Sequence, residues 1–298
     1  ALMAENGLRG SDILRLGQLS TPADRDVALY ARPEDPPSST RLKVYRLGEI
    51  IPLSEAVPML ENFGFRVIEE VPFDLAGGAI GWIHDFRLEG IVRPDDFEAF
   101  RARIEPALDA VLTGLQENDP FNSLIAVAGL SAEEANWFRA WFRYLRQTGV
   151  SYSIANVVEV LRRNAPLTRL LADRFRARFA HDADRAREAK LDETFADGLA
   201  GVQSIDDDNI LSLFRGVVAA MLRTNAFVPG GPEALAFKFD SAAVPGLPKP
   251  RPWREIWVYS PRVEGIHLRG GRIARGGLRW SDRRDDFRTE ILGLVKAQ

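Results

Sequence analysis

The residues with the clearest chemical potential lie near the end of the chain, between Glu264 and Gln298. Two adjacent glycines, Gly276 and Gly277, stand between Arg275 and Arg279 and follow a segment that alternates like a β-strand. Glycines let the backbone approach a ligand with amide N–H groups uncovered, and arginine offers a planar fork of donors that suits carboxylate or phosphate. The spacing therefore predicts a site for a small anion.

The same residues also have a purely structural interpretation. A Gly-Gly hairpin followed by an arginine occurs in proteins that bind nothing there, and residues 283–286 (RRDD) also suit a solvated first helical turn. Glycines at Gly271 and Gly276 have the spacing of a phosphate loop, but Gly277-Leu278 stands where that motif needs Lys-Ser/Thr. A G-x-G-x-x-G fingerprint does not occur either, so no nucleotide motif decides between the two interpretations.

Two strands and a helix are expected to position this site. Gly270-Gly271 can supply the positive φ of a tight hairpin between residues 266–268 and residues 273–274. Ser281 or Asp282 can then cap a helix whose apolar residues follow the helical period, namely Phe287, Ile291, Leu294 and Val295. A different stripe of that helix holds Asp285, Thr289, Leu292 and Lys296, so Lys296 is expected to point away from the Phe287 face.

Residues 270–298, GGRIARGGLRWSDRRDDFRTEILGLVKAQ, closely resemble the opening of the catalytic region in the large bacterial NAD-specific glutamate dehydrogenases. The resemblance is a long ungapped run, and it extends to about residues 41–298. Smaller glutamate dehydrogenases carry Lys-Gly-Gly here, where the lysine and glycines help to hold the substrate carboxylate. The resemblance gives that role to Arg275, Gly276 and Gly277, with Arg279 supporting the loop. Lys296 then lies near a second substrate lysine, which is expected just beyond the end of the chain.

The resemblance implies an activity and also what this chain leaves out. The family interconverts L-glutamate with 2-oxoglutarate and ammonia by hydride transfer to NAD, as a homo-oligomer in amino-acid catabolism. The catalytic lysine and aspartate and the NAD-binding domain are expected after Gln298. We therefore expect no catalytic or cofactor-binding residue in this chain, which is interpreted as an inactive internal fragment.

Composition limits the other classes of function. With 298 residues and 46% hydrophobic content, the chain can form two or three domains, and its net charge of −3 gives no bulk attraction to nucleic acid or anionic membrane. Cysteine is absent, which excludes disulfides and thiol chemistry. The three histidines, His84, His181 and His267, lie far apart without the acidic spacing of a metal site, so no metal is expected.

The sequence also predicts a cytoplasmic protein. No apolar run approaches the roughly 20 residues that a membrane-spanning helix needs. Residues 1–17 lack the basic region and apolar core of a signal peptide, and the missing initiating Met is consistent with excision from a longer chain.

The expected fold class is α+β multidomain, with four segments. Residues 1–40 are interpreted as the tail of a preceding segment, with one strand over residues 26–33, and a Pro/Ser linker. Residues 41–118 give strand, helix, strand, strand and helix, typical of the ACT-like α/β sandwiches that bind amino acids or pair with one another. Residues 119–228 are predicted to be a helical domain, and residues 229–298 the truncated, β-rich start of the substrate-binding domain.

Several features within these segments have competing interpretations. His84, among alternating apolar strand positions, is better explained as a core residue with one hydrogen bond than as a catalytic group or pH sensor. Residues 206–208, three aspartates, are better explained as a helix cap than as a cation site. Arginines of residues 139–146 and 174–178 suggest nucleic-acid binding, but a solvated basic face or an interdomain contact explains them better, because the aromatic residues fall on the opposite face.

Two rival functions stay open beside the dehydrogenase. The ACT-like and helical parts would suit an amino-acid-sensing or oligomerisation module without catalysis, which can hold alongside the first hypothesis. Nucleic-acid binding is the third hypothesis, and it requires retention on DNA or RNA at low salt.

Overall fold

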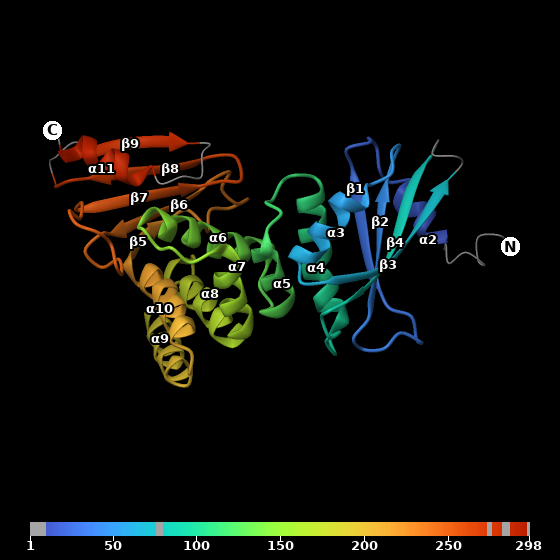
Figure 1. Cartoon of the computed structure of the whole chain (residues 1–298), viewed down its shortest axis with the longest axis horizontal. Helices are drawn as coiled ribbons and strands as arrows, with labels where there is room; N and C mark the ends of the chain where they lie inside the picture. The colour runs from blue at the N-terminus through green and yellow to red at the C-terminus, as the bar shows by residue number, and fades with distance from the viewer. Residues whose placement is uncertain (1–9, 76–79, 273–275, 282–286, 297–298) are drawn as a thin grey trace. The chain divides into compact units, whose positions relative to one another are not determined.

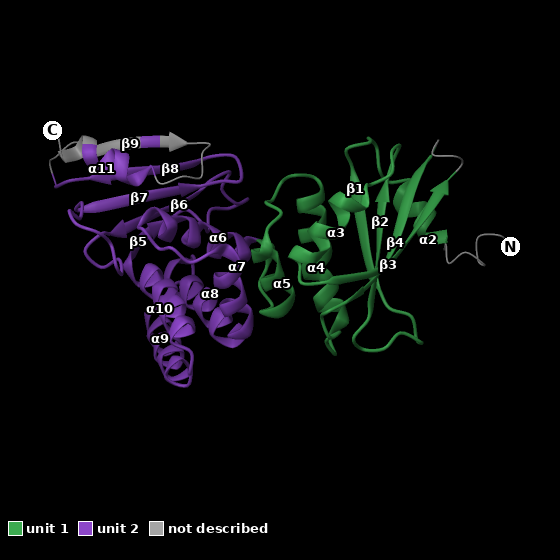
Figure 2. Cartoon of the chain, viewed as in Figure 1, with its two compact units in different colours: residues 1–132 green, residues 133–298 purple. Residues whose placement is uncertain are grey.

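The structure, a computed structural model, describes residues 10–75, 80–272, 276–281 and 287–296. It divides into two compact units, Ala1–Ala132 and Glu133–Gln298 (Figure 2). Each unit contains helices and one antiparallel sheet, which confirms the expected α+β multidomain class.

The first unit is built on a four-stranded antiparallel sheet with the order β1-β2-β4-β3 (Figure 1). Its strands are β1 (Arg25–Tyr30), β2 (Thr40–Arg46), β3 (Arg66–Leu75) and β4 (Gly81–Glu89). The last three are the strands predicted within residues 41–118, and β1 overlaps the strand predicted for residues 26–33. β1 lies in the same sheet, where Val27 is opposite Val44, so the segment expected to be a tail before residue 40 contributes an edge strand.

Two helices cover one face of this sheet, α3 (Leu53–Asn62) and α4 (Phe97–Leu112). The helical period of each presents apolar residues to the strands, and these are buried: Met59 and Leu60 from α3, and Phe100, Ile104 and Leu108 from α4. The side chain of Asp96 caps α4 by accepting a hydrogen bond from the Ala99 amide at 2.9 Å. The N-cap position of α3 is occupied by Pro52, and Ser54 lies inside the helix.

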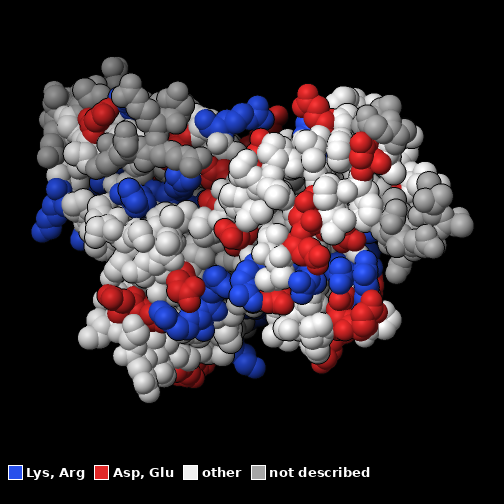
Figure 3. Space-filling view, turned by 45° about the vertical axis from the view of Figure 1, so that its right-hand side comes forward, with Lys and Arg blue, Asp and Glu red and all other residues white. Residues whose placement is uncertain are grey.

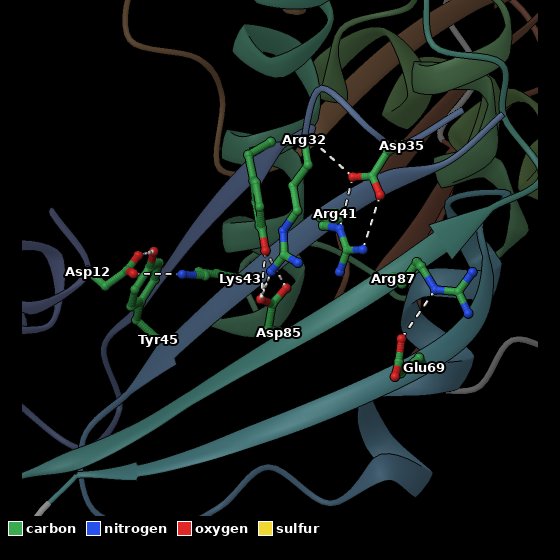
Figure 4. Close-up of polar contacts among 10 residues, drawn as sticks. Asp12, Arg32, Asp35, Arg41, Lys43, Tyr45, Glu69, Asp85 and Arg87 are labelled. Carbon is green, nitrogen blue, oxygen red and sulfur yellow. Dashed lines mark hydrogen bonds and ion pairs between the residues drawn. The ribbon is translucent and has the colours of Figure 1, made fainter. Parts of the chain in front are cut away.

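The opposite face of the sheet is partly covered by helix α2 (Gly10–Leu16), and it carries a small apolar cluster of Leu16, Tyr45 and Ile83 beside buried polar side chains. Asp12 of α2 accepts hydrogen bonds from Lys43 Nζ at 2.6 Å and from Tyr45 OH at 2.7 Å, and all three side chains are buried (Figure 4). Farther along the face, Tyr30 OH donates to Asp85 at 2.6 Å, and burial raises the pKa of both groups. The buried charges on this face are therefore paired, as burial requires.

His84 is a core residue, and its two ring nitrogens both have partners. Its Nε2 accepts a hydrogen bond from the Ile51 amide at 3.1 Å, and its Nδ1 lies 2.8 Å from Glu70 Oε1. Because Nε2 accepts, Nδ1 carries the proton in the neutral ring and donates to Glu70. The expectation of a core histidine is confirmed, with two hydrogen bonds in place of one.

A short 3-10 turn, η1 (Pro120–Asn122), and helix α5 (Ser123–Val127) complete the first unit. The second unit then begins with α6 (Ala132–Gln147), and four more helices follow it: α7 (Ile154–Arg163), α8 (Ala165–Phe179), α9 (Arg185–Ala200) and α10 (Ile205–Ala220). Ser153 caps α7 by accepting a hydrogen bond from the Asn156 amide at 3.1 Å, and Pro166 lies in the first turn of α8.

The three aspartates of residues 206–208 do not cap α10. Its cap is Ser204, whose Oγ accepts a hydrogen bond from the Asp207 amide at 3.3 Å. The Asp207 carboxylate instead accepts hydrogen bonds from Nε and Nη2 of Arg163, at 3.0 and 2.8 Å. It also accepts one from the side-chain amide of Asn164, at 2.9 Å. Asp207 therefore connects the start of α10 to the end of α7.

The arginines of α6 and α8 are mostly paired inside the unit, which corrects the expectation of a solvated basic face. Arg143 lies 3.8 Å from Glu264, so one contact does cross the expected boundary between residues 228 and 229. Arg139 is fully buried, and Arg174, only 6% exposed, pairs with Asp192 at 2.6 Å. Arg169 and Arg176 both pair with Glu134. On the surface drawn in Figure 3, acidic and basic side chains are interspersed.

The second sheet has five antiparallel strands in sequence order, β5-β6-β7-β8-β9. They are β5 (Met221–Thr224), β6 (Leu235–Asp240), β7 (Arg254–Tyr259), β8 (Glu264–Arg269) and β9 (Gly276–Ser281), and helix α11 (Arg288–Lys296) follows. Helices α6 and α8 pack on one face through aromatic rings. Tyr144 stacks on Phe239 at 4.3 Å between centroids, and Phe175 lies 6.2 Å from Phe237.

This packing places the expected boundary between residues 228 and 229 inside one compact unit. The helices and the β-rich segment share a core. β5 was also expected to be helical, but Met221 pairs with Phe239 of β6.

Candidate functional site

The two glycines of the predicted anion site are the first two residues of strand β9. In the register, Gly276 lies opposite Arg269 and Gly277 opposite Leu268. The sequence had placed both glycines after a strand, so this is a correction. Among the described strands, β9 has β8 as its one neighbour and forms the edge of the sheet.

An edge position limits which backbone groups of the glycines can meet a ligand. In an antiparallel pair, successive residues alternately direct their N–H and C=O groups to the neighbouring strand and away from it. One of Gly276 and Gly277 therefore pairs with β8, and the other presents its backbone groups to the open edge. One of the two glycine amides is thus left without a strand partner among the described strands.

The connection between β8 and β9 is longer than the expected two-residue hairpin. β8 ends at Arg269, which lies opposite Gly276, so residues 270–275 form the connection. Arg269 spans its start, because Nε donates to the Gly271 carbonyl at 3.1 Å and Nη2 to the Arg272 carbonyl. Arg275, together with Ile273 and Ala274, lies outside the described residues.

Helix α11 begins later than predicted, and it buries one side chain that the predicted apolar face did not include. Ser281 ends β9 and Asp282 lies outside the described residues, while the helix starts at Arg288. Phe287 and Ile291 are 3% and 1% exposed, as the apolar period predicted, but Leu292 is also buried, at 9%. Lys296 is the last residue of α11, and the predicted direction of its side chain falls outside what the structure describes.

Arg279 connects the candidate site to α11. Its Nη1 forms an ion pair with Glu290 Oε2, and the two side chains are 42% and 55% exposed. A pair this exposed contributes little stability and exchanges partners readily. Arg279 can thus contact the helix and still offer its guanidinium to an anionic ligand.

Residues that the sequence analysis did not single out anchor this strand–helix pair from within the unit. Arg288 Nε lies 3.0 Å from Glu255 Oε2, and Arg288 Nη2 lies 2.5 Å from Glu255 Oε1. Tyr144 OH donates to the same carboxylate at 3.1 Å, and burial together with the charge of Glu255 raises the pKa of Tyr144 well above its ordinary value. The sequence of β7, REIWVY, indicates that Glu255 is buried, because strand alternation puts it on the same face as Trp257 and Tyr259, which are buried.

The described residues do not fit a dinucleotide or a metal ion. A dinucleotide site places a glycine-rich loop between a strand and a helix N-terminus, whereas Gly276 and Gly277 begin an edge strand. No group of three or more His, Cys, Asp or Glu side chains in this part of the chain is arranged to hold a metal. No helix within the described ranges is long and apolar enough to cross a membrane.

Comparison with known proteins gives a consistent set of relationships. Three family models match in order: "Glutamate dehydrogenase, ACT3 domain" over residues 24–98, "Glutamate dehydrogenase, helical motif 3" over residues 116–181, and "Bacterial NAD-glutamate dehydrogenase, catalytic domain" over residues 194–298. The first match includes β1, and the last includes β9 and α11.

Three curated relatives share one name. NAD-specific glutamate dehydrogenases of Halomonas elongata and Mycobacterium tuberculosis are each 41% identical, over 96% and 92% of this chain. The Pseudomonas aeruginosa enzyme is 40% identical over 86% of the chain. The chain spans 18% of the length of the Halomonas and Mycobacterium enzymes and 17% of the length of the Pseudomonas enzyme. The chain therefore belongs to the bacterial NAD-specific glutamate dehydrogenase family.

Proposed function

We propose that this chain is part of an NAD-dependent glutamate dehydrogenase that converts L-glutamate, NAD and water to 2-oxoglutarate, ammonia and NADH. The observation that carries the proposal is the catalytic-domain match over residues 194–298, which contains the edge strand with Gly276 and Gly277. Family relatives named for this activity cover most of the chain.

Within that enzyme, we propose that Arg275, Gly276 and Gly277 hold a substrate carboxylate, with Arg279 and Lys296 contributing positive charge. An outward amide on an edge strand and arginine side chains are donors that suit a carboxylate. The exposure of Arg279 and the position of Lys296 in α11, the helix that follows β9, support this assignment. Hydride transfer needs substrate and nicotinamide in contact, and NAD would be bound by the rest of the parent protein.

The test is NADH formation from L-glutamate by the parent protein and by this chain alone. We expect the parent to reduce NAD and the isolated chain to be inactive, since the described residues fit no dinucleotide. Activity of the isolated chain would refute the assignment of NAD to other parts of the parent. An inactive, folded parent would refute the proposed reaction.

A second candidate function is amino-acid sensing by the ACT-like unit, and one pocket favours it. A cavity of about 670 Å³ lies among α2, β1 and α4, and both arginine and carboxylate side chains line it. Arg15 pairs with Asp26 there at 2.9 Å. Asp109 Oδ1 is buried without a hydrogen-bond partner among the described residues. An amino-acid zwitterion carries a carboxylate that suits the arginines and an ammonium group that suits the carboxylates of this pocket.

Calorimetric titration of the chain with the common amino acids tests this second function. Saturable heat with one amino acid, abolished by Asp109→Asn, would support sensing. No heat across the panel would favour a role in assembly alone.

We further propose that the parent enzyme is a cytoplasmic homo-oligomer. The absence of cysteine suits a reducing compartment. Light scattering of the purified parent measures the assembly directly, and a monomer would contradict the oligomer.

A further inference from the structure

The helix that follows the proposed substrate-binding strand is fixed to the sheet by an ion pair inside the second unit. Arg288 and Glu255 meet through two N–O contacts, at 3.0 and 2.5 Å, and their side chains are 1% and 0% exposed. A two-point contact of this kind sets both the distance and the orientation of the two planar groups. It joins the first residue of α11 to β7.

A second buried contact fixes the same helix end. Gln147, at the end of α6, accepts hydrogen bonds through Oε1 from the amides of Phe287 and Arg288, at 3.0 and 3.2 Å. Phe287 also stacks on Trp257 of β7, with 6.0 Å between ring centroids. The N-terminus of α11 thus has fixed partners on α6 and on β7.

Stability alone gives a weak reason for a charged pair at this place. Burying two charges costs desolvation that their attraction only partly returns, and apolar residues of similar volume often stabilise as well or better. What the ion pair adds over apolar packing is a defined geometry. A helix anchored in this way has little freedom to slide along the sheet.

The proposed function assigns substrate binding to this anchored helix and to strand β9, which is in contact with it. β9 begins with Gly276 and Gly277, α11 ends with Lys296, and the Arg279–Glu290 pair joins the strand to the helix. A dicarboxylate substrate has two anionic ends, and its length must match the spacing of the groups that bind them. The position of α11 relative to β9 sets that spacing.

We propose that Arg288 is a positioning residue for substrate specificity: its ion pair with Glu255 fixes the span between β9 and α11 and so selects a dicarboxylate of the length of glutamate. The inference rests on the proposed function and goes beyond it. Arg288 acts through α11 and does not itself touch the substrate.

The test compares kcat/KM for L-glutamate with that for L-aspartate, one methylene shorter, in the parent enzyme. Arg288→Lys keeps the charge but loses the two-point geometry. We expect kcat/KM for glutamate to fall by about tenfold to a hundredfold, mainly through KM, because displacements near 1 Å at a reacting site have effects of that size. The preference for glutamate over aspartate should fall, while KM for NAD stays unchanged.

Two further variants separate positioning from folding. Glu255→Gln keeps the shape of the partner and removes its charge, and it should shift the glutamate preference in the same direction. Lys43→Met breaks a buried ion pair with Asp12 in the first unit and serves as the matched control. It should lower thermal stability and leave the substrate preference unchanged.

Hydrogen exchange on the present chain measures the anchor without activity. Arg288→Lys should speed amide exchange in residues 276–281 more than in β6, whereas uniform acceleration would overturn the local anchor. A folded Arg288→Lys parent with an unchanged glutamate preference would overturn the specificity role. If the wild-type parent does not oxidise glutamate, the proposed function fails, and the specificity role falls with it whatever the exchange result.

Discussion

The side chain of Gln147 caps the helix that begins at Arg288: its Oε1 atom accepts the Arg288 amide at 3.2 Å and the preceding Phe287 amide at 3.0 Å. A helix N-terminus leaves amides without intrahelical partners, and this helix obtains its acceptor from α6, far away in the sequence. The helical segment therefore takes part directly in building the strand–helix pair at the candidate site. We expect this dependence to appear in stability as well as in activity.

Gln147→Ala should destabilise the second unit by about 1 to 3 kcal/mol, because it leaves two buried amides without an acceptor. Gln147 is 3% exposed, so water cannot easily replace its oxygen. Urea unfolding of the chain measures the change, and Gln203→Ala at an exposed position is the control, with an effect within about 0.5 kcal/mol. Equal effects of the two substitutions would show that the cap contributes nothing.

The Arg163–Asp207 pair predicts a stability that depends on pH. Hydrogen bonds from Arg163 lower the pKa of the Asp207 carboxyl. A carboxyl whose pKa is lower in the folded chain stabilises the fold fully above its unfolded pKa of about 3.9. That stabilisation is lost as the pH falls through the lowered folded value.

Asp207→Asn should therefore cost about 1 to 3 kcal/mol of unfolding free energy at pH 7, with less difference from the wild type below about pH 4. Asp206→Asn, in the same helical turn but exposed, is the control. Denaturant unfolding at a series of pH values gives both curves. A gap for Asp207→Asn that stays constant from pH 7 to pH 2 would contradict the assignment of the lowered pKa.

His84→Leu should destabilise the first unit, although leucine is apolar and similar in size. The substitution removes the acceptor of the Ile51 amide and the donor to Glu70, and the expected cost is about 1 to 3 kcal/mol. Thermal unfolding measures it, with His181→Leu at an exposed position for comparison. A leucine variant as stable as the wild type would mean that the two hydrogen bonds of His84 contribute no net stability.

Local patterns predicted the strands of the first unit well, but they did not predict which sheet each strand joins. Alternation identified a strand near residues 26–33, yet only its pairing with β2 shows that β1 belongs to the ACT-like unit. Met221 and Leu222 continue the helical apolar period of α10, and pairing with β6 overrides that period. Non-local hydrogen bonding decided both cases.

The candidate site was partly predictable for a similar reason. The glycines and arginines near the end of the chain stand out by type and spacing. The buried contact of Arg288 with Glu255 does not, because it joins residues 33 positions apart and depends on how α11 lies across β7. A glutamate in phase with buried aromatic residues was the one local sign of it.

The most direct test of the central claim is the steady-state kinetics of the parent enzyme carrying Arg275→Ala. If Arg275 and the edge glycines hold the substrate carboxylate, KM for L-glutamate should rise by about tenfold or more, since a charge-assisted hydrogen bond contributes roughly 1.5 to 3 kcal/mol. KM for NAD should stay unchanged. An Arg275→Ala enzyme with wild-type KM and kcat for glutamate would contradict the account.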